Sequence, residues 1–476
     1  MIFNSFNFLI IYPLLFLAYY AIPAKYSETR NFYLLLVSYL LYMNFNAAYA
    51  IILLAITVVT YLSARMIEIP EKVAGGGGKI KMLTGVILCI IPLLVFKYYN
   101  FVCESGFALL RMIGMRFELP GLNWAVPVGI SFFTFQALGY LWDVWYGRIK
   151  AEKNFLHYAL FVGFFPSIVS GPINKASLVL PQIKSFRPYF DYPKAVEGLK
   201  MILWGMFMKV VIADRVALYV DTVFSHYENY SGLSCFVASL LYTTQIYADF
   251  AGYSLMAIGV GKTLGFELTE NFRRPYLAYS ITDFWRRWHI SLSTWLKDYV
   301  YIPLGGSRCS KLRNYWNIIV TFLVSGIWHG ANWTFVVWGL WHGLFQVVEK
   351  AIGQQKCEYG SWGKSVKILI TFLLVNFAWI FFRMPTIGDA CSVIARIFDP
   401  SLFGSLYTPE KANTLFMVMG VMIIMVKDLT DEYCPKSFKL MENDRMWVRW
   451  MTYVVCIVMI MLTGVFDAGQ FIYANF

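Results

Sequence analysis

Apolar runs close to the length of a membrane-spanning helix recur along the whole chain, and they constrain the fold more than any other feature. A helix that crosses a bilayer needs about 20 predominantly apolar residues. Of the 476 residues, 59% are hydrophobic and only 14% are charged, whereas soluble domains carry about 25% charged residues. A soluble chain of this length would form several domains with polar surfaces. Because the charges for such surfaces are missing, we predict a polytopic membrane protein.

The apolar runs predict an all-α protein with one integral-membrane domain over residues 1–476 and roughly 11 transmembrane helices. We expect these spans near residues 6–22, 32–43, 47–64, 82–96, 126–150, 198–215, 233–258, 333–348, 366–382, 415–426 and 450–465. Residues 103–116 and 387–397 are expected to form surface helices. At residues 164–173 two prolines and a glycine interrupt an apolar run. This predicts either a re-entrant break inside the protein or a kinked helix end at the interface.

The net charge of +12 is typical of a membrane protein whose cytoplasmic loops are rich in Lys and Arg, so we expect no nucleic-acid partner. The basic loops that follow the first span and the third, the latter with a glycine run at 75–78, are expected in the cytoplasm. This places the N-terminus outside the cytoplasmic membrane. The first apolar run lacks a preceding basic region, so we expect a retained helix rather than a signal peptide. Eight dispersed cysteines without a C-x-x-C pair argue against a disulfide framework and against a metal site.

The region from Asp283 to Gly330 concentrates the polar chemistry of the chain. Between Asn271 and Asn317 there are eight basic residues and two acidic ones. Aromatic residues alternate with these charges at Trp285, Trp288, Trp295 and Tyr299. This pattern is typical of an amphipathic helix embedded at a membrane interface.

If residues 281–300 form one helix, four functional groups share a single polar face: Arg286, His289, Ser293 and Lys297. Asp283 and Arg287 would then form a supporting pair one turn apart. Pro303 and the glycines that follow would end the helix. Such a face suits a phosphorylated donor such as coenzyme A, or an acidic carrier protein. We therefore predict that the donor is bound by Arg286, Arg287, Ser293 and Lys297.

His329 follows an almost wholly apolar run that starts at Asn317. Burial disfavours the charged form of an imidazole, so we expect a neutral ring that can accept a proton. A general base that activates a hydroxyl for attack on a thioester needs this property. A buried histidine is, however, more often a residue with a purely structural hydrogen bond, so the position alone does not establish the role.

The other histidines and one buried acid require separate interpretations. His342 repeats the Trp-His-Gly pattern of His329, but in one continuous helix the two rings would point apart and could not share a site. His157 and His226 lie in polar segments and are expected at the surface. Asp249 lies inside an expected span, where it would either serve a functional cavity or pair with a basic side chain of the next segment.

Several segments resemble the membrane-bound O-acyltransferase family, in particular its bacterial branch that O-acetylates alginate and other exported polysaccharides. The resemblance extends over most of the chain, through the segments VGISFFTFQ, FFPSIVSGPI, MKVVIADR, YADFAGYS, ENFRRPY, FWRRWHISLSTWLKDYVYIPLGG, SGIWHG, FAWIFFR and FIY. It implies tilted helices around a thinned centre, with a funnel from each side. It also implies that His329 is the catalytic histidine and His289 the second functional position.

The resemblance further implies transfer of an acyl group from a cytoplasmic donor, either acetyl-CoA or another acyl thioester, to an acceptor on the far side. In the polysaccharide branch a separate exported or membrane-anchored acetyltransferase completes the transfer to sugar. No bound cofactor or metal is expected, and the lipid bilayer is the remaining partner.

Two alternatives stay open at this level. Ala251 and Leu255, in the segment DFAGYSL, are more similar to the branch that D-alanylates teichoic acids, whereas the run from Pro303 to Gly306 is typical of the polysaccharide branch. A transporter of an anionic lipid or glycan would instead line its path with Arg286, Arg287 and Lys297. The absence of an evident internal repeat disfavours that class.

Overall fold

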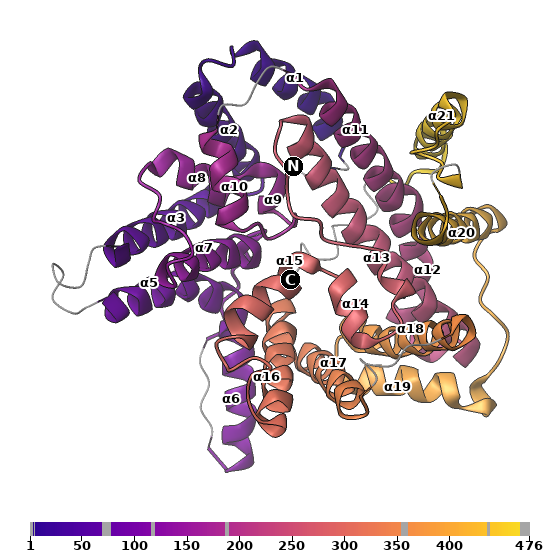
Figure 1. Cartoon of the computed structure of the whole chain (residues 1–476). Helices are drawn as coiled ribbons and strands as arrows, with labels where there is room; N and C mark the ends of the chain where they lie inside the picture. The colour runs from indigo at the N-terminus through magenta and orange to yellow at the C-terminus, as the bar shows by residue number, and fades with distance from the viewer. Residues whose placement is uncertain are drawn as a thin grey trace. The chain divides into compact units, whose positions relative to one another are not determined.

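The computed structural model describes residues 3, 5–68, 78–115, 120–185, 190–353, 360–435 and 438–466, and every regular element in these ranges is a helix (Figure 1). The prediction of an all-α fold is therefore confirmed. Five described helices are long and apolar enough to cross a membrane: Ala47–Glu68, Gly78–Met112, Trp362–Arg383, Lys411–Tyr433 and Met446–Thr463. The protein is thus a multi-pass membrane protein, and the total of roughly 11 spans stays a prediction. Most of the glycine run at 75–78 and the FIY segment lie outside the described residues.

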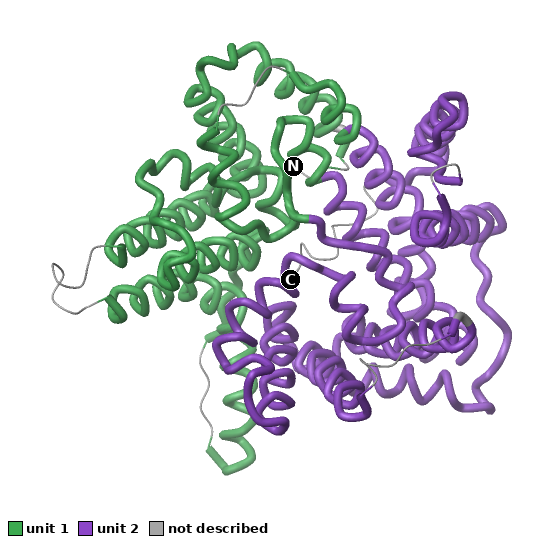
Figure 2. The backbone as a smooth tube through the Cα atoms, in the orientation of Figure 1, with its two compact units in different colours: residues 1–198, 257–269, 473–476 green, residues 199–256, 270–472 purple. Residues whose placement is uncertain are grey.

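The chain divides into two compact units (Figure 2). As far as these ranges are described, unit 1 contains Met1–Gly198 and Ala257–Thr269, and unit 2 contains Leu199–Met256 and Glu270–Ile472. Helices α11 (Tyr192–Met206) and α13 (Gly232–Thr263) each have residues in both units. The prediction of a single membrane domain is not tested by this division.

Unit 1 is built from helices that pack around α3 and α7. The bounds are α1 Phe6–Ala21, α2 Ser27–Met43, α3 Ala47–Glu68, α5 Gly78–Leu93, α6 Tyr99–Met112, α7 Ile130–Trp145, α8 Phe155–Gly163, α9 Phe165–Ile168 and α10 Ala176–Lys184. Helix α3 contacts both α5 and α7, and α2 contacts α8 and α9. Nearly every residue of α7 is buried, which fits its almost wholly apolar sequence.

The break expected at residues 164–173 lies inside unit 1. Helix α8 ends at Gly163 and α9 begins at Phe165 with Pro166 in its first turn, and the side chains around them are buried. The backbone amide of Phe165 donates to Oγ of Ser38 at 3.1 Å. A protein side chain therefore supplies a hydrogen-bond partner for a backbone amide at the break between the two helices, as a buried backbone requires.

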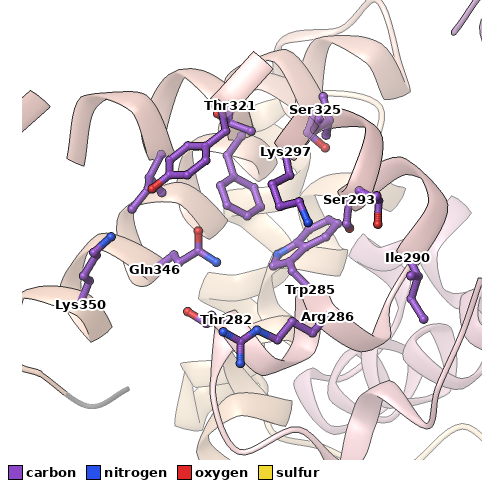
Figure 3. Close-up of a pocket in the computed structure, with 15 residues that line it drawn as sticks. Thr282, Trp285, Arg286, Ile290, Ser293, Lys297, Thr321, Ser325, Gln346 and Lys350 are labelled. Carbon is purple, nitrogen blue, oxygen red and sulfur yellow. The ribbon is translucent and has the colours of Figure 1, made fainter. Parts of the chain in front are cut away.

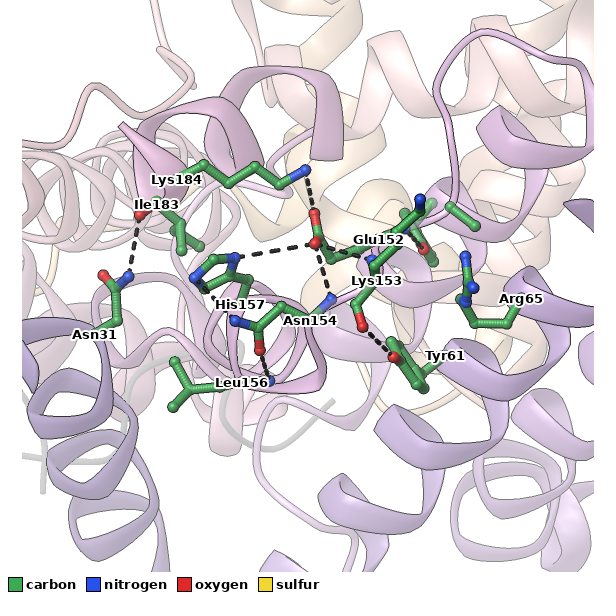
Figure 4. Close-up of polar contacts among 12 residues, drawn as sticks. Asn31, Tyr61, Arg65, Glu152, Lys153, Asn154, Leu156, His157, Ile183 and Lys184 are labelled. Atoms are coloured by element: carbon green, nitrogen blue, oxygen red, sulfur yellow. Dashed lines mark hydrogen bonds and ion pairs between the residues drawn. The ribbon is translucent and has the colours of Figure 1, made fainter. Parts of the chain in front are cut away.

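A polar cluster joins α2, α8 and α10 within unit 1 (Figure 4). The buried Glu152 carboxylate pairs with Lys184 at 2.5 Å and accepts from the backbone amide of Asn154 at 3.0 Å. His157 lies 2.9 Å from Glu28 and is buried. The expectation that His157 is a surface residue is therefore wrong, because folding of α8 against α2 covers its polar segment. His226 is exposed, as expected.

Unit 2 contains the remaining helices and the region from Asp283 to Gly330. The bounds are α12 Asp214–Ser225, α14 Ile281–Arg287, α15 Ile290–Leu296, α16 Lys311–His329, α17 Trp333–Ala351, α18 Ser361–Arg383, α19 Ile387–Phe398, α20 Lys411–Tyr433 and α21 Met446–Thr463. Phe207–Ala213 and Lys297–Tyr301 are π-helical, a geometry that is frequent at functional sites. The helix expected at residues 387–397 is confirmed as α19.

Asp249 is an ion-pair partner in the interior of unit 2. Its carboxylate lies 2.6 Å from Nζ of the buried Lys209, which is also 2.8 Å from Asp214. Asp249 thus pairs with a basic side chain, as one of its two interpretations predicted. The partner, Lys209, belongs to the preceding segment and not to the next one. Gly205 and Gly252 allow this approach, because a Cβ at Gly205 would lie 2.5 Å from the carbonyl oxygen of Gly252.

We predict that Glu152→Gln destabilises the protein at neutral pH and has little effect in acid. Burial alone would raise the pKa of Glu152, but the hydrogen bonds from Lys184 and Asn154 outweigh it and lower the pKa below the ordinary 4.5. The stabilisation is therefore present above about pH 4.5 and is lost as the pH falls through the lowered value. Thermal unfolding of the purified protein at pH 7 and at an acid pH well below that lowered pKa measures this. The exposed Glu104→Gln is the control, and an equal loss at both pH values would contradict the prediction.

Candidate active site

Helices α16 and α17 form a closely packed pair in unit 2. A Cβ added to Gly326 would overlap the carbonyl oxygen of Phe335, and one added to Gly339 would overlap that of Phe322. Glycine is thus required at both positions for the two backbones to approach. Helix α16 ends at His329, and Asn332 begins α17 by accepting a hydrogen bond from the amide of Thr334 at 3.0 Å.

His329 is buried at the last residue of α16. Its Nδ1 lies 2.7 Å from the carbonyl oxygen of Ser325. A carbonyl oxygen only accepts, so Nδ1 carries the proton and Nε2 of the neutral ring carries the lone pair. The rings of Trp328 and Trp338 pack edge-to-face with the imidazole, with centroids at 4.9 and 4.7 Å. The imidazole therefore has a defined tautomer, with the lone pair that a general base needs on Nε2.

His289 interrupts the helix that was expected over residues 281–300, and that expectation is wrong. Helix α14 ends at Arg287, α15 begins at Ile290, and His289 between them has a left-handed φ of 44°. The carbonyl oxygen of Asn271 accepts from the amide of Ile290 at 2.9 Å. This long-range hydrogen bond replaces a helical one, and local periodicity gives no sign of it.

The break turns His289 away from the polar face and into the interior. Its ring is fully buried, with its centroid 6.4 Å from that of His329. His289 lies outside the five candidate spans, and burial together with the nearby His329 lowers the pKa of its imidazole well below the usual 6.5. The ring is therefore neutral near pH 7. The sequence prediction that the two histidines belong to one site agrees with their proximity.

The geometric argument that excluded His342 is wrong, because His329 ends one helix and His342 belongs to the next. His342 is buried on α17, and its ring lies 5.0 Å from Trp338, which also contacts His329. Among the described residues neither ring nitrogen of His342 has a hydrogen-bond partner. No distance here places His342 against His329, so its exclusion from the chemistry stays a prediction.

A cavity of about 420 Å³ opens among α14, α15, α16 and α17 (Figure 3). Three of the four residues predicted to bind the donor line it: Arg286, Ser293 and Lys297. Sequence reasoning missed Gln346 and Lys350, which reach the same cavity from α17. Their spacing of four residues, which places both on one face of α17, was the only available signal.

The described lining of the cavity carries three cationic side chains and no carboxylate. In the part of the chain that the structure describes, Arg286 and Lys350 form no ion pair, and Lys297 approaches Asp298 only to 3.9 Å. Cations of three separate elements thus face one space. Such an arrangement is suited to a group with several negative charges, such as a phosphorylated ligand.

Arg287 does not line this cavity. Its guanidinium lies 3.0 Å from Asp283 and 2.9 Å from Glu432, which confirms the predicted pair with Asp283. Partial burial opposes the charge, but the hydrogen bond to Glu432 and the proximity of Asp283 outweigh it and raise the pKa of Arg287. Arg287 therefore links α14 to α20 through ion pairs. Because it does not line the cavity, the cavity gives no support to its predicted contact with the donor.

Ser325 connects the cavity to His329. Its side chain belongs to the cavity lining, and its carbonyl oxygen holds Nδ1 of His329 one turn later in α16. A polyanionic molecule in the cavity would thus lie beside the turn that positions the buried base. No group of three or more His, Cys, Asp or Glu side chains among the described residues is arranged to hold a metal ion.

Comparisons with known proteins identify the family. The profile of the membrane-bound O-acyltransferase family matches residues 148–385. A probable alginate O-acetylase AlgI of Pseudomonas syringae pv. tomato is 38% identical over 405 residues, which cover 84% of this chain and 75% of the relative. The chain belongs to the membrane-bound O-acyltransferase family. It is accordingly an O-acyltransferase, and the matched residues include both His289 and His329.

Other relatives within the family differ in their acceptors. A peptidoglycan O-acetyltransferase of Helicobacter pylori is 35% identical over 418 residues, covering 80% of this chain and 76% of the relative. A teichoic acid D-alanyltransferase of Bacillus subtilis is 27% identical over 253 residues, covering 52% of this chain and 62% of the relative. The O-acetyltransferase relatives are therefore more similar to this chain than the D-alanyltransferase.

We predict that Gly326→Ala destabilises the folded protein. The added methyl group would overlap the carbonyl oxygen of Phe335 and push α16 away from α17. Overpacking of this kind costs about 1–3 kcal/mol. The measurement is the thermal unfolding midpoint of the purified protein. Gly106→Ala on α6 is the matched control, since nothing lies within 4 Å of its added Cβ. An unchanged midpoint for Gly326→Ala would contradict the prediction.

Proposed function

We propose that this enzyme takes an acetyl group from a cytoplasmic thioester donor and passes it across the membrane for O-acetylation of an exported or cell-wall polysaccharide. The observation that carries the proposal is the cationic cavity beside the turn that holds His329. The similarity to probable alginate O-acetylases and to a peptidoglycan O-acetyltransferase supports acetyl transfer and a polysaccharide acceptor. The second candidate function is D-alanyl transfer by the same family, because Ala251 and Leu255 are more similar to the branch that D-alanylates teichoic acids.

The donor in this proposal is acetyl-CoA or another acyl thioester bound as a substrate. Arg286, Lys297 and Lys350 are the side chains that would meet its phosphate groups, and Ser293 offers a hydroxyl beside them. Guanidinium groups pair with phosphate through two parallel hydrogen bonds, which also orient the ligand. The thioester end would then extend toward Ser325 and the buried histidines.

In the proposed chemistry, Nε2 of His329 accepts the proton of a hydroxyl group whose oxygen attacks the thioester carbonyl. A carbon–oxygen bond forms, the carbon–sulfur bond breaks, and the departing thiolate receives the proton. General-base catalysis of this type contributes about 10²–10⁴-fold to the rate. His289 supports the reaction by relaying the proton or by orienting the donor.

We further propose that the protein lies in the cytoplasmic membrane with its N-terminus outside, as the basic loops predict. A separate exported or membrane-anchored acetyltransferase would then complete the transfer to the sugar. A transporter of anionic glycans would need no buried base, so the two histidines favour acyl transfer over that class.

We predict that His329→Ala lowers the acetylation of exported polysaccharide by about 10²-fold or more, because the attacking hydroxyl loses its base. The measurement is the base-released acetate of the polymer from cells that express equal amounts of folded protein. His226→Ala, at an exposed position, is the control and should match the wild type. Normal acetylation by a folded His329→Ala protein would overturn the proposal.

We predict that Arg286→Met raises the KM for acetyl-CoA about tenfold and leaves kcat nearly unchanged, because a charged hydrogen bond to phosphate contributes about 1.5–3 kcal/mol. The assay is transfer of radioactive acetyl groups from acetyl-CoA in isolated membranes. Arg308→Met changes an exposed arginine of the same stretch outside the cavity and should have no effect. An unchanged KM would remove Arg286 from the donor site.

A further inference from the structure

We propose that Asn271 is the positioning residue for His289, and that it commits His289 to accepting a proton rather than donating a hydrogen bond during acyl transfer. The inference rests on the proposed function and assigns a residue that the sequence pattern did not single out. Asn271 is buried in the middle of the segment between α13 and α14.

Asn271 holds the break between α14 and α15 at several atoms. Its side-chain oxygen lies 3.1 Å from Nδ1 of His289 and accepts from the hydroxyl of Ser291 at 2.9 Å. Its side-chain nitrogen donates to Oγ of Ser254 at 3.0 Å. Its main-chain carbonyl accepts from the amide of Ile290 at 2.9 Å. One residue therefore holds both the backbone that bends at His289, through its main-chain carbonyl, and the ring, through its side chain.

The direction of these hydrogen bonds decides the tautomer of His289. The amide of Ser291 also points to the side-chain oxygen of Asn271, at 3.3 Å. A backbone N–H only donates, so the atom that meets Nδ1 is the acceptor end of the Asn271 amide. Nδ1 of His289 must then carry the proton, and Nε2 of the neutral ring carries the lone pair.

This tautomer selects one of the two supporting roles of His289. A neutral ring with its proton on Nδ1 has no N–H left at Nε2 to orient the donor by donating a hydrogen bond, but its lone pair can take a proton. Nδ1 of His329 is held in the same way by the carbonyl of Ser325. Both rings of this 6.4 Å pair therefore present an acceptor nitrogen, which fits a proton relay.

The chemical nature of Asn271 matters as well as its position. A carboxylate at this place would also accept from Nδ1, but its charge would favour the imidazolium form. Three rings of described residues contact the imidazole of His289, those of Phe250 on α13 and of Trp328 and His329 on α16, and of these three His329 is titratable. The neutral amide thus orients His289 without making it hold the proton.

The test compares Asn271→Asp, Asn271→Ala and Ser254→Ala in membranes supplied with radioactive acetyl-CoA, from pH 6 to pH 9. Asn271→Asp should lower the rate about tenfold at pH 6, recover toward pH 9 and leave the KM for acetyl-CoA unchanged. Asn271→Ala should lower kcat at every pH. Ser254→Ala removes only the partner of the amide nitrogen and should stay within about twofold of the wild type. A pH profile of Asn271→Asp that is parallel to the wild type would overturn the proposal.

A second measurement does not depend on activity. Nitrogen-15 NMR of histidine-labelled wild-type protein, assigned by comparison with His289→Gln, should show the Nδ1-protonated tautomer at His289. An Nε2-protonated ring would overturn the proposal even if Asn271 variants fail to fold. Wild-type membranes that transfer no acetyl group would count against the proposed function instead, and the NMR signal would still decide the tautomer.

Discussion

The close approach of α16 and α17 is the contact on which the candidate active site depends. Gly326 and Gly339 bring the two backbones together, and this packing encloses the last turn of α16 in aromatic side chains. Inside such an environment a fixed hydrogen-bond partner stabilises an imidazole, because an unsatisfied polar group is costly to bury. The carbonyl of Ser325 supplies that partner for His329. The same turn also borders the cavity, so helix packing links the orientation of the His329 ring to the shape of the cavity.

Neighbouring cations in this region serve different purposes according to the acids near them. Arg287 is neutralised by Asp283 and Glu432 and braces α14 against α20. Arg286 faces a cavity without a carboxylate in its described lining, so its charge stays available for a ligand. The two arginines are adjacent in the sequence and equivalent by composition, and the difference arises from which side of a seven-residue helix each one occupies.

Much of the fold and part of the site could be predicted from residue patterns. Long apolar runs require helices in a bilayer because the backbone must satisfy its own hydrogen bonds, and α3, α18 and α20 appear where the runs predicted them. His329 stood out as an imidazole after an apolar run, and Arg286 and Lys297 as cations on one helical face. The break at His289 could not be found in this way, since it depends on hydrogen bonds to Asn271, which precedes it by a full segment. Lys350 was missed because α17 reaches the cavity only after it folds back along α16.

The sequence by itself determined that the chain is a helical membrane protein, and it predicted that the chemistry lies between Asp283 and Gly330 with His329 as the candidate base. These properties follow from local composition and spacing, which act within one helix. The tertiary structure alone decided that His289 leaves the polar face, that Arg287 is braced while Arg286 is available, and that His342 belongs to a separate helix from His329. Each of these outcomes depends on a partner distant in the chain. The periodicity of one segment cannot report a hydrogen bond or ion pair that only folding creates.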